Sequence, residues 1–323
     1  MIAAPIFTVF WSLAAKDGGT AKHHGPNCAD EPGCESPDNN HYATPLTRDA
    51  LIAAQTAEEL AREFGFELQD KASAQIAVEV RTEPGGMLSY HYTVHNSTAS
   101  SQRIHTVAIQ ADVSVTTNNV VPPPGWIVGH CCTVDNFRTN ATGIRVMEWG
   151  VGTDGAMIPP GGSVGEYVWI STAPPGIKHF HVQGFAANDI PETDVLPESE
   201  DERLLLDLRD PFNNSFSGKV LAPDSIPSDV MPGGLLDRLA FFKHQALSLG
   251  WISGPGADGV VQSLDAKLNA AKDSVARDQN KTAVNQLKAF IHEIEAQRGK
   301  HLNDNAYFLL KVNAEFIISR LSP

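Results

Sequence analysis

The sequence predicts a chain of two modules, an antiparallel β-sandwich followed by a four-helix bundle. Two changes in hydrophobic periodicity carry this prediction. From about residue 74, apolar residues alternate with polar ones, as in half-buried strands, whereas from Leu235 they recur at the spacing of amphipathic helices. A chain of 323 residues with 42% hydrophobic residues is long enough for one or two cores.

These changes divide the chain into five segments. They are a signal peptide at 1–18, a Cys-containing loop and amphipathic helix at 19–73, the sandwich at 74–186, an acidic Pro-rich linker at 187–231 and the helical domain at 232–323. The helix is expected over 47–64, where apolar residues share one face and Gly65 follows as a stop. In the linker, Leu204–Leu206 with Leu208 predicts an edge strand or a helical turn docking on the sandwich.

The first fifteen residues, MIAAPIFTVFWSLAA, are apolar and end in small residues, as in the hydrophobic region and cleavage zone of a signal peptide. No Lys or Arg precedes the apolar run, so a buried N-terminal strand or helix stays open as the alternative. We expect a protein that is secreted, periplasmic or held at the cell surface.

The four cysteines agree with an oxidising compartment, since they are even in number and fall in two groups. Cys28 and Cys34 lie in a Gly/Pro-rich stretch, and Cys131 and Cys132 are adjacent. Pairing within or between the groups is open, so all four are disulfide candidates of unassigned connectivity.

Short β-like runs separated by turn residues predict a sandwich. The runs begin at Ile76 and continue as LSYHYTVHN, RIHTVAIQ, GWIVGH, IRVMEW, VGEYVWIS and KHFHVQGF. The Tyr-rich strand ending in Asn96, the Pro123–Trp126 corner and the Pro174–Gly176 turn resemble the Ig-like sandwich modules of exported bacterial proteins, over roughly residues 74–186. The resemblance implies a fold and says little about a ligand.

Four amphipathic segments with short connections follow from Leu235 and predict a bundle. Their residues, including Lys243–Ala246, Leu249–Ile252, Ser263–Leu268 and Glu295–Lys300, resemble the FIMAH module, a helical domain near the C-termini of exported bacterial proteins. That resemblance implies an accessory module without catalytic residues. Asn313, on an apolar stripe, is expected in a buried amide network with Asn285 and Gln286.

The formal net charge of −14 argues against binding to a nucleic-acid backbone or an anionic membrane. Apart from the N-terminal run, no apolar stretch approaches the length of a membrane span. The sequence has no phosphate-binding loop or HExxH motif. We therefore predict a non-enzyme that uses no cofactor, and the oligomeric state is left open.

Alternation along two strands gives the one repeated ligand-like pattern. His91 and His95 share a face of one strand, and His179 and His181 share a face of another. If the strands were neighbours, four imidazoles would converge in a set suited to copper or zinc. We expect instead that Tyr90, Tyr92, Val94, Phe180 and Val182 face the core and that the histidines face solvent.

The sequence thus predicts a secreted, non-catalytic binding or scaffold protein with an accessory helical module. Its partner would be an unidentified protein or cell-surface ligand. The alternative is an exported metalloprotein that binds copper or zinc through the strand histidines.

Overall fold

The structure is a computed structural model that describes residues 48–111, 120–129, 137–139, 145–188, 205, 208 and 213–322. The expected signal peptide at 1–18 and the four cysteines, Cys28, Cys34, Cys131 and Cys132, lie outside the described residues. The chain divides into two compact units, Met1–Asp70 with Ala186–Phe216 and Lys71–Phe185 with Ser217–Pro323. The second unit contains both the sandwich and the helical bundle.

The first unit is built on helix α2 (Arg48–Phe64), which matches the predicted amphipathic helix. Gly65, at a φ of +73°, follows it in the left-handed conformation that favours glycine. One apolar cluster, Ala57, Leu60, Ala61, Phe66, Leu68, Leu205 and Leu208, forms its core. Leu205 and Leu208 are helical and buried in this cluster, in agreement with the helical alternative at these two positions.

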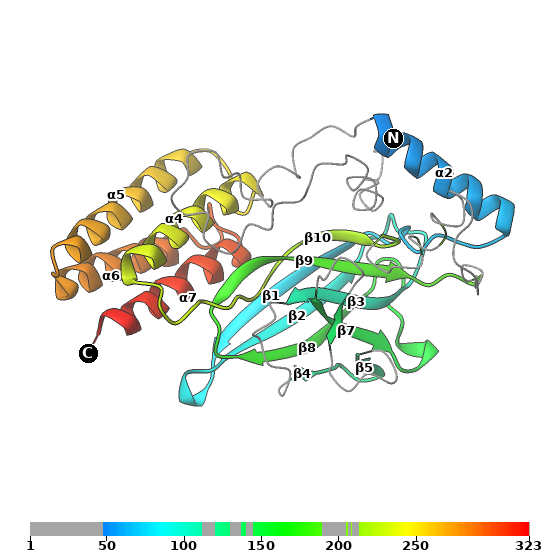
Figure 1. Cartoon of the computed structure of the whole chain (residues 1–323), viewed down its shortest axis with the longest axis horizontal. Coiled ribbons are helices and arrows are strands. Elements are labelled where there is room, and N and C mark those ends of the chain that lie inside the picture. Colours follow the sequence, from blue (N-terminus) through cyan, green and yellow to red (C-terminus); the bar gives the residue numbers. More distant parts are fainter. Residues whose placement is uncertain are drawn as a thin grey trace, which may run out of the picture. The chain divides into compact units, whose positions relative to one another are not determined.

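One sheet of the sandwich contains β1 (Ala74–Thr82), β2 (Leu88–Asn96), β8 (Ser163–Ser171) and the two-residue β4 (Val120–Val121), in the order β1-β2-β8-β4 (Figure 1). The other contains β10 (Phe216–Pro223), β9 (Pro175–Gly184), β3 (Ile104–Ala111), β7 (Arg145–Val151) and β5 (Trp126–Val128), in that order, and β6 (Phe137–Thr139) also pairs with β7. Strand β2 pairs antiparallel with β1 and β8, and β3 pairs antiparallel with β7 and β9. The orders β1-β2-β8 and β10-β9-β3 match A-B-E and G-F-C of an immunoglobulin domain, which confirms the predicted fold class.

Strand β10 corrects one expectation, because residues 216–223 fall inside the segment predicted to be a linker. Its second half is buried, and Asp224 N–H donates to Pro174 O at 2.9 Å beside the start of β9. A Cβ added to Gly218 would lie 2.6 Å from the Phe180 ring, so glycine here lets the aromatic ring pack against the backbone. Strand β10 therefore completes the sheet. The sequence did not predict it, because glycine, proline and acidic residues lie in and around it.

Aromatic side chains from both sheets fill the sandwich core. Trp126, Trp149 and Trp169 are buried, as predicted, together with Tyr90 and the directly paired Tyr92 and Tyr167. The Trp149 ring packs edge-on to the Tyr167 ring at 5.6 Å between centroids, within the range that favours such pairs. The core-facing residues read from β2 and β9 are correct, since Val94, Phe180 and Val182 are buried as well. The expectation that the histidines face solvent is wrong for His181, whose pKa is lowered by burial, and the other three are only partly exposed.

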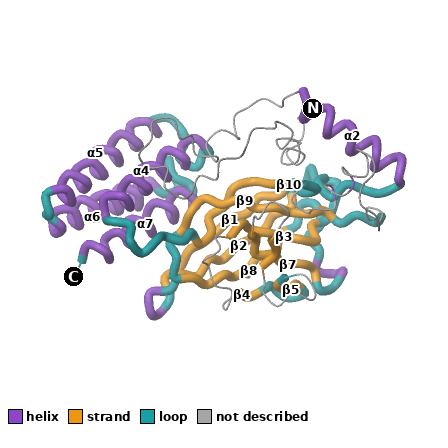
Figure 2. The backbone as a smooth tube through the Cα atoms, viewed as in Figure 1, coloured by secondary structure: helices purple, strands orange, loops and turns teal. Residues whose placement is uncertain are grey.

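The predicted four-helix bundle consists of α4 (Pro232–Ser248), α5 (Ala257–Ala276), α6 (Asn280–Gln297) and α7 (Asp304–Leu321), which gather beside the strands of the same unit (Figure 2). Helix α4 ends as expected, with Gly250 at a φ of +71° and Trp251 N–H donating to Ala246 O in a Schellman motif. Helix α7 packs against α4 and α6 and also against β1 and β9. None of the helices in the described part of the chain is long and apolar enough to cross a membrane.

Candidate functional site

The four strand histidines do not meet. His91 and His95 lie on β2 in one sheet, and His179 and His181 lie on β9 in the other. The metalloprotein alternative required these strands to be neighbours, and they are not. Within the ranges that the structure describes, no group of three or more His, Cys, Asp or Glu side chains has the arrangement of a metal site.

Each histidine pair has its own polar surroundings. His95 Nδ1 lies 2.7 Å from Ser163 Oγ on β8. The His179 and His181 rings stack at 6.4 Å, and Lys219 Nζ on β10 lies 2.7 Å from His179 Nε2. Desolvation, and secondarily the charge of Lys219, lowers the pKa of His181 to about 4. A lysine ammonium directed at this pair opposes the approach of a second cation.

A polar network lies on the outer face of the β1–β2 hairpin and β8, and we call it the hairpin network. Its members are Glu79, Arg81, Glu83, Ser89, His91 and Glu166. Arg81 donates to Glu79 at 2.7 Å, and this hydrogen bond is the main cause that lowers the pKa of the Glu79 carboxyl. Five of the six side chains are charged or titratable, so the network presents both signs of charge on one face.

Glu166 enters the network through a local distortion of β8. The pairing of β2 with β8 shifts register between Tyr92 and Val94, and Glu166 takes a φ of +66° there. A bulge of this kind turns a side chain in a new direction, and a non-glycine residue at positive φ is strained. The Glu166 carboxylate stays 74% exposed and lies 3.7 Å from His91 Nδ1. The bulge therefore directs the Glu166 carboxylate over the outer face of the hairpin.

Ser89, His91 and Glu166 have the order of a nucleophile, base and acid, since Ser89 Oγ lies 3.1 Å from His91 Nε2. The hydroxyl, however, has one proton and donates it to Glu83 Oε1 at 2.6 Å. His91 Nε2 also lies 3.5 Å from Arg81 Nη1, a group that can only donate, so the Ser89 proton is directed at Glu83 and not at this nitrogen. The arrangement offers hydrogen-bonding groups and charges of both signs on one face of the sheet.

Sequence reasoning missed the residues that tie the second unit together. Asn313 is buried as expected, but its side chain donates to Pro175 O of β9, whereas Asn285 is exposed and Gln286 partly so, which corrects the predicted amide network. Lys243, whose side chain is fully buried, pairs with Asp265 between α4 and α5. A lysine among apolar residues at helical spacing was the available signal for this buried ion pair.

Residues 250–319, which span α5, α6 and most of α7, match the family model described as the FIMAH domain. This match confirms the resemblance inferred from the helical segments. Among solved structures, the chain is similar to an uncharacterised protein from Nocardia farcinica whose crystal structure is described as an immunoglobulin-like fold. That similarity has 13% identity and a TM-score of 0.24, and it covers 45% of this chain and 96% of that one. No curated protein matches the chain. The chain therefore carries a FIMAH-type helical module behind an Ig-like sandwich.

Proposed function

We propose that this chain is an exported, non-catalytic binding or scaffold protein that acts in the periplasm, at the cell surface or outside the cell. The Ig-like sandwich presents the recognition surface, and the FIMAH-type bundle is an accessory module. The match of residues 250–319 to a module found in exported proteins supports the location.

The observation that carries the binding role is the hairpin network. Its strained, exposed Glu166 and the neighbouring Arg81 offer opposite charges on a rigid sheet face. Strained residues cluster at functional positions because the surrounding fold holds them there at a cost. Charged groups fixed in this way suit a partner that carries polar groups of both signs, such as a surface protein or a charged cell-wall polymer.

Three measurements test the proposal. Cell fractionation is expected to find the chain outside the cytoplasm, and thiol titration of the denatured, exported protein is expected to find no free thiol. Biolayer interferometry against purified cell-wall polymers and surface proteins is expected to detect binding that Glu166→Ala and Arg81→Ala each weaken at least about tenfold, the loss of 1.4 kcal/mol.

The control is Lys281→Ala, an exposed change on the bundle that leaves the sandwich untouched. Cytoplasmic retention of the protein would contradict export. Equal binding by all three variants would exclude the hairpin network as the recognition surface.

A further inference from the structure

The Pro174–Pro175–Gly176 turn, which the sequence marked as a strand corner, makes direct contact with the helical bundle. Pro175 O accepts a hydrogen bond of 2.8 Å from Asn313 Nδ2 on α7. The same amide nitrogen donates to Leu309 O at 2.8 Å, so both of its hydrogens are used. Both bonds are buried, and a buried hydrogen bond is costly to leave unmade. Asn313 thus fastens α7 to the first residue of β9.

A second contact joins α4 to the same end of the sandwich. Asp224, directly after β10, accepts from Lys178 Nζ of β9 at 2.7 Å and pairs with the Arg238 guanidinium of α4. The two ion pairs share the Asp224 carboxylate. The side chains of Lys178, Asp224 and Arg238 are 13%, 15% and 26% exposed, so this three-residue cluster is largely withdrawn from water. Water screens such a pair less than one at the surface, and removing one member leaves the others unbalanced.

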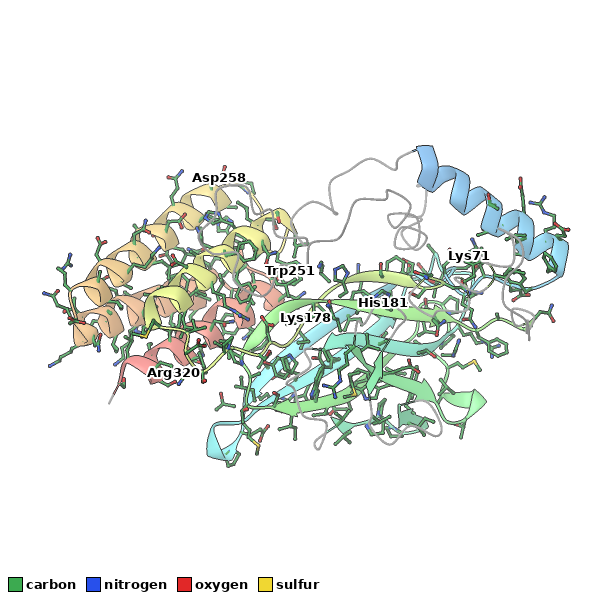
Figure 3. All side chains as sticks on the ribbon, viewed as in Figure 1. Lys71, Lys178, His181, Trp251, Asp258 and Arg320 are labelled. Atoms are coloured by element: carbon green, nitrogen blue, oxygen red, sulfur yellow. The ribbon has the colours of Figure 1, made fainter. Side chains whose placement is uncertain are left out.

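Gly176 is required for this arrangement. A Cβ at position 176 would lie 2.3 Å from Asp224 Oδ2 and 2.5 Å from Asp224 Cβ, distances that real side chains do not tolerate. Any other residue at 176 therefore displaces the carboxylate that holds Lys178 and Arg238. Lys178 lies on β9 at the end near the helices, and His181 lies farther along the same strand (Figure 3).

Helix α7 is shaped for two partners. Its buried residues occupy consecutive positions, from Ala306 to Leu310 and from Val312 to Ala314. A helix that packs on one side buries a single stripe, so burial all round indicates packing on two sides. The helices α4 and α6 cover part of this surface, and β1 and β9 meet another part.

We propose that the Pro174–Lys178 segment and Asp224 form a docking site for the chain's own FIMAH-type bundle, which engages it through Asn313 and Arg238. The bundle and the sandwich are then one rigid, cooperatively folding body, and the bundle is not a flexibly tethered appendage. The proposal concerns the assembly of the second unit, so it stands or falls independently of the ligand.

The test is urea unfolding of the full chain, followed at 222 nm for the helices and by near-ultraviolet circular dichroism for the sandwich aromatics. In the wild type, the two curves are expected to coincide, as they do for one cooperative unit. In Asn313→Leu and in Gly176→Ala, the helical curve is expected to move to lower urea and separate from the aromatic curve. The Lys178 and Asp224 amide hydrogens are expected to exchange about tenfold faster in both variants.

Asp237→Asn is the matched control, because Asp237, the neighbour of Arg238 on α4, pairs with Lys272 of α5 inside the bundle. It is expected to keep the curves together. If Gly176→Ala does not fold, Asn313→Leu decides the matter. Separate curves in the wild type, or unchanged curves and exchange rates in Asn313→Leu, would overturn the proposal.

Discussion

At the scale of single residues, the core tyrosines differ in whether their hydroxyls are satisfied. Tyr90 Oη donates to Ala173 O at 2.8 Å, whereas the buried Oη atoms of Tyr92 and Tyr167 have no hydrogen-bond partner among the residues that the structure describes. Burial raises the pKa of Tyr90 and of Tyr92 well above the usual value, so both hydroxyls stay protonated. An unpaired buried hydroxyl costs free energy, so removing the Tyr92 hydroxyl and removing the Tyr90 hydroxyl are expected to change the stability in opposite directions.

We predict that Tyr92→Phe raises the free energy of unfolding by about 1 kcal/mol, because it removes a polar atom that the fold leaves unpaired. Tyr90→Phe is the control and is expected to lower it by about 1–2 kcal/mol, because it leaves the Ala173 carbonyl unpaired. Urea unfolding measures both. Equal destabilisation by the two changes would instead indicate an ordered water molecule on the Tyr92 hydroxyl.

His181 gives a pH dependence of known sign. The pKa of this histidine is about 4 in the folded chain and near 6.5 when unfolded, so between these values the unfolded chain binds a proton that the folded chain does not. Stability is therefore complete above pH 6.5 and is lost as the pH falls toward 4. His181→Gln is expected to remove about 1–3 kcal/mol of this loss. Urea midpoints measured from pH 7 to 4.5 test this, with His95→Gln as the control, and equal slopes in both variants would contradict it.

At the scale of secondary-structure elements, the sequence predicts an element best where only one of its faces packs against the core. Strand β1, and β2 from Tyr90 onward, alternate cleanly because one face meets the core and the other does not. Strand β10 escaped notice because Gly218 serves a close contact with Phe180 and gives no periodic signal of its own. The two-sided burial of α7 was missed for a related reason, since a single stripe of apolar residues was sufficient to predict the bundle.

In the buried ion pair between α4 and α5, removing the carboxylate alone is expected to cost far more stability than replacing both members of the pair. Lys243 is 0% exposed and Asp265 is 33% exposed, so Asp265→Ala leaves a buried ammonium without its counter-charge. We predict a loss of about 3–5 kcal/mol for Asp265→Ala, and near-neutral stability for Lys243→Met combined with Asp265→Ala, since an apolar side chain replaces the buried charge.

Thermal or urea unfolding at 222 nm measures these changes. Asp237→Ala, which breaks an ion pair whose carboxylate is 64% exposed, is the control and is expected to cost less than about 1 kcal/mol. A loss of that small size for Asp265→Ala would mean that water reaches the Lys243 ammonium.

At the scale of the whole molecule, the fold class and the order of the modules could be predicted from the sequence, whereas the grouping of segments could not. The core of the first unit joins Ala57 and Leu60 to Leu205 and Leu208, which are far apart in the chain. Periodicity reports which face of an element is apolar and carries no information on which distant segment covers it. The hairpin network was hidden for the same reason, because register brings β1, β2 and β8 together and a bulge directs Glu166 over them.

The helical segment provides the last prediction, since four amphipathic helices can supply a core by themselves. We predict that a fragment of residues 232–323 folds alone, with a mostly helical circular dichroism spectrum and a cooperative transition. Its urea midpoint is expected to lie below that of the helices in the full chain, because the fragment loses the Pro175 partner of Asn313 and the Asp224 partner of Arg238. In the fragment, Asn313→Leu is expected to be neutral or stabilising, whereas in the full chain it destabilises. A disordered spectrum would contradict an independent bundle core, and an equal midpoint in the fragment and the full chain would show that docking contributes nothing to the stability of the helices.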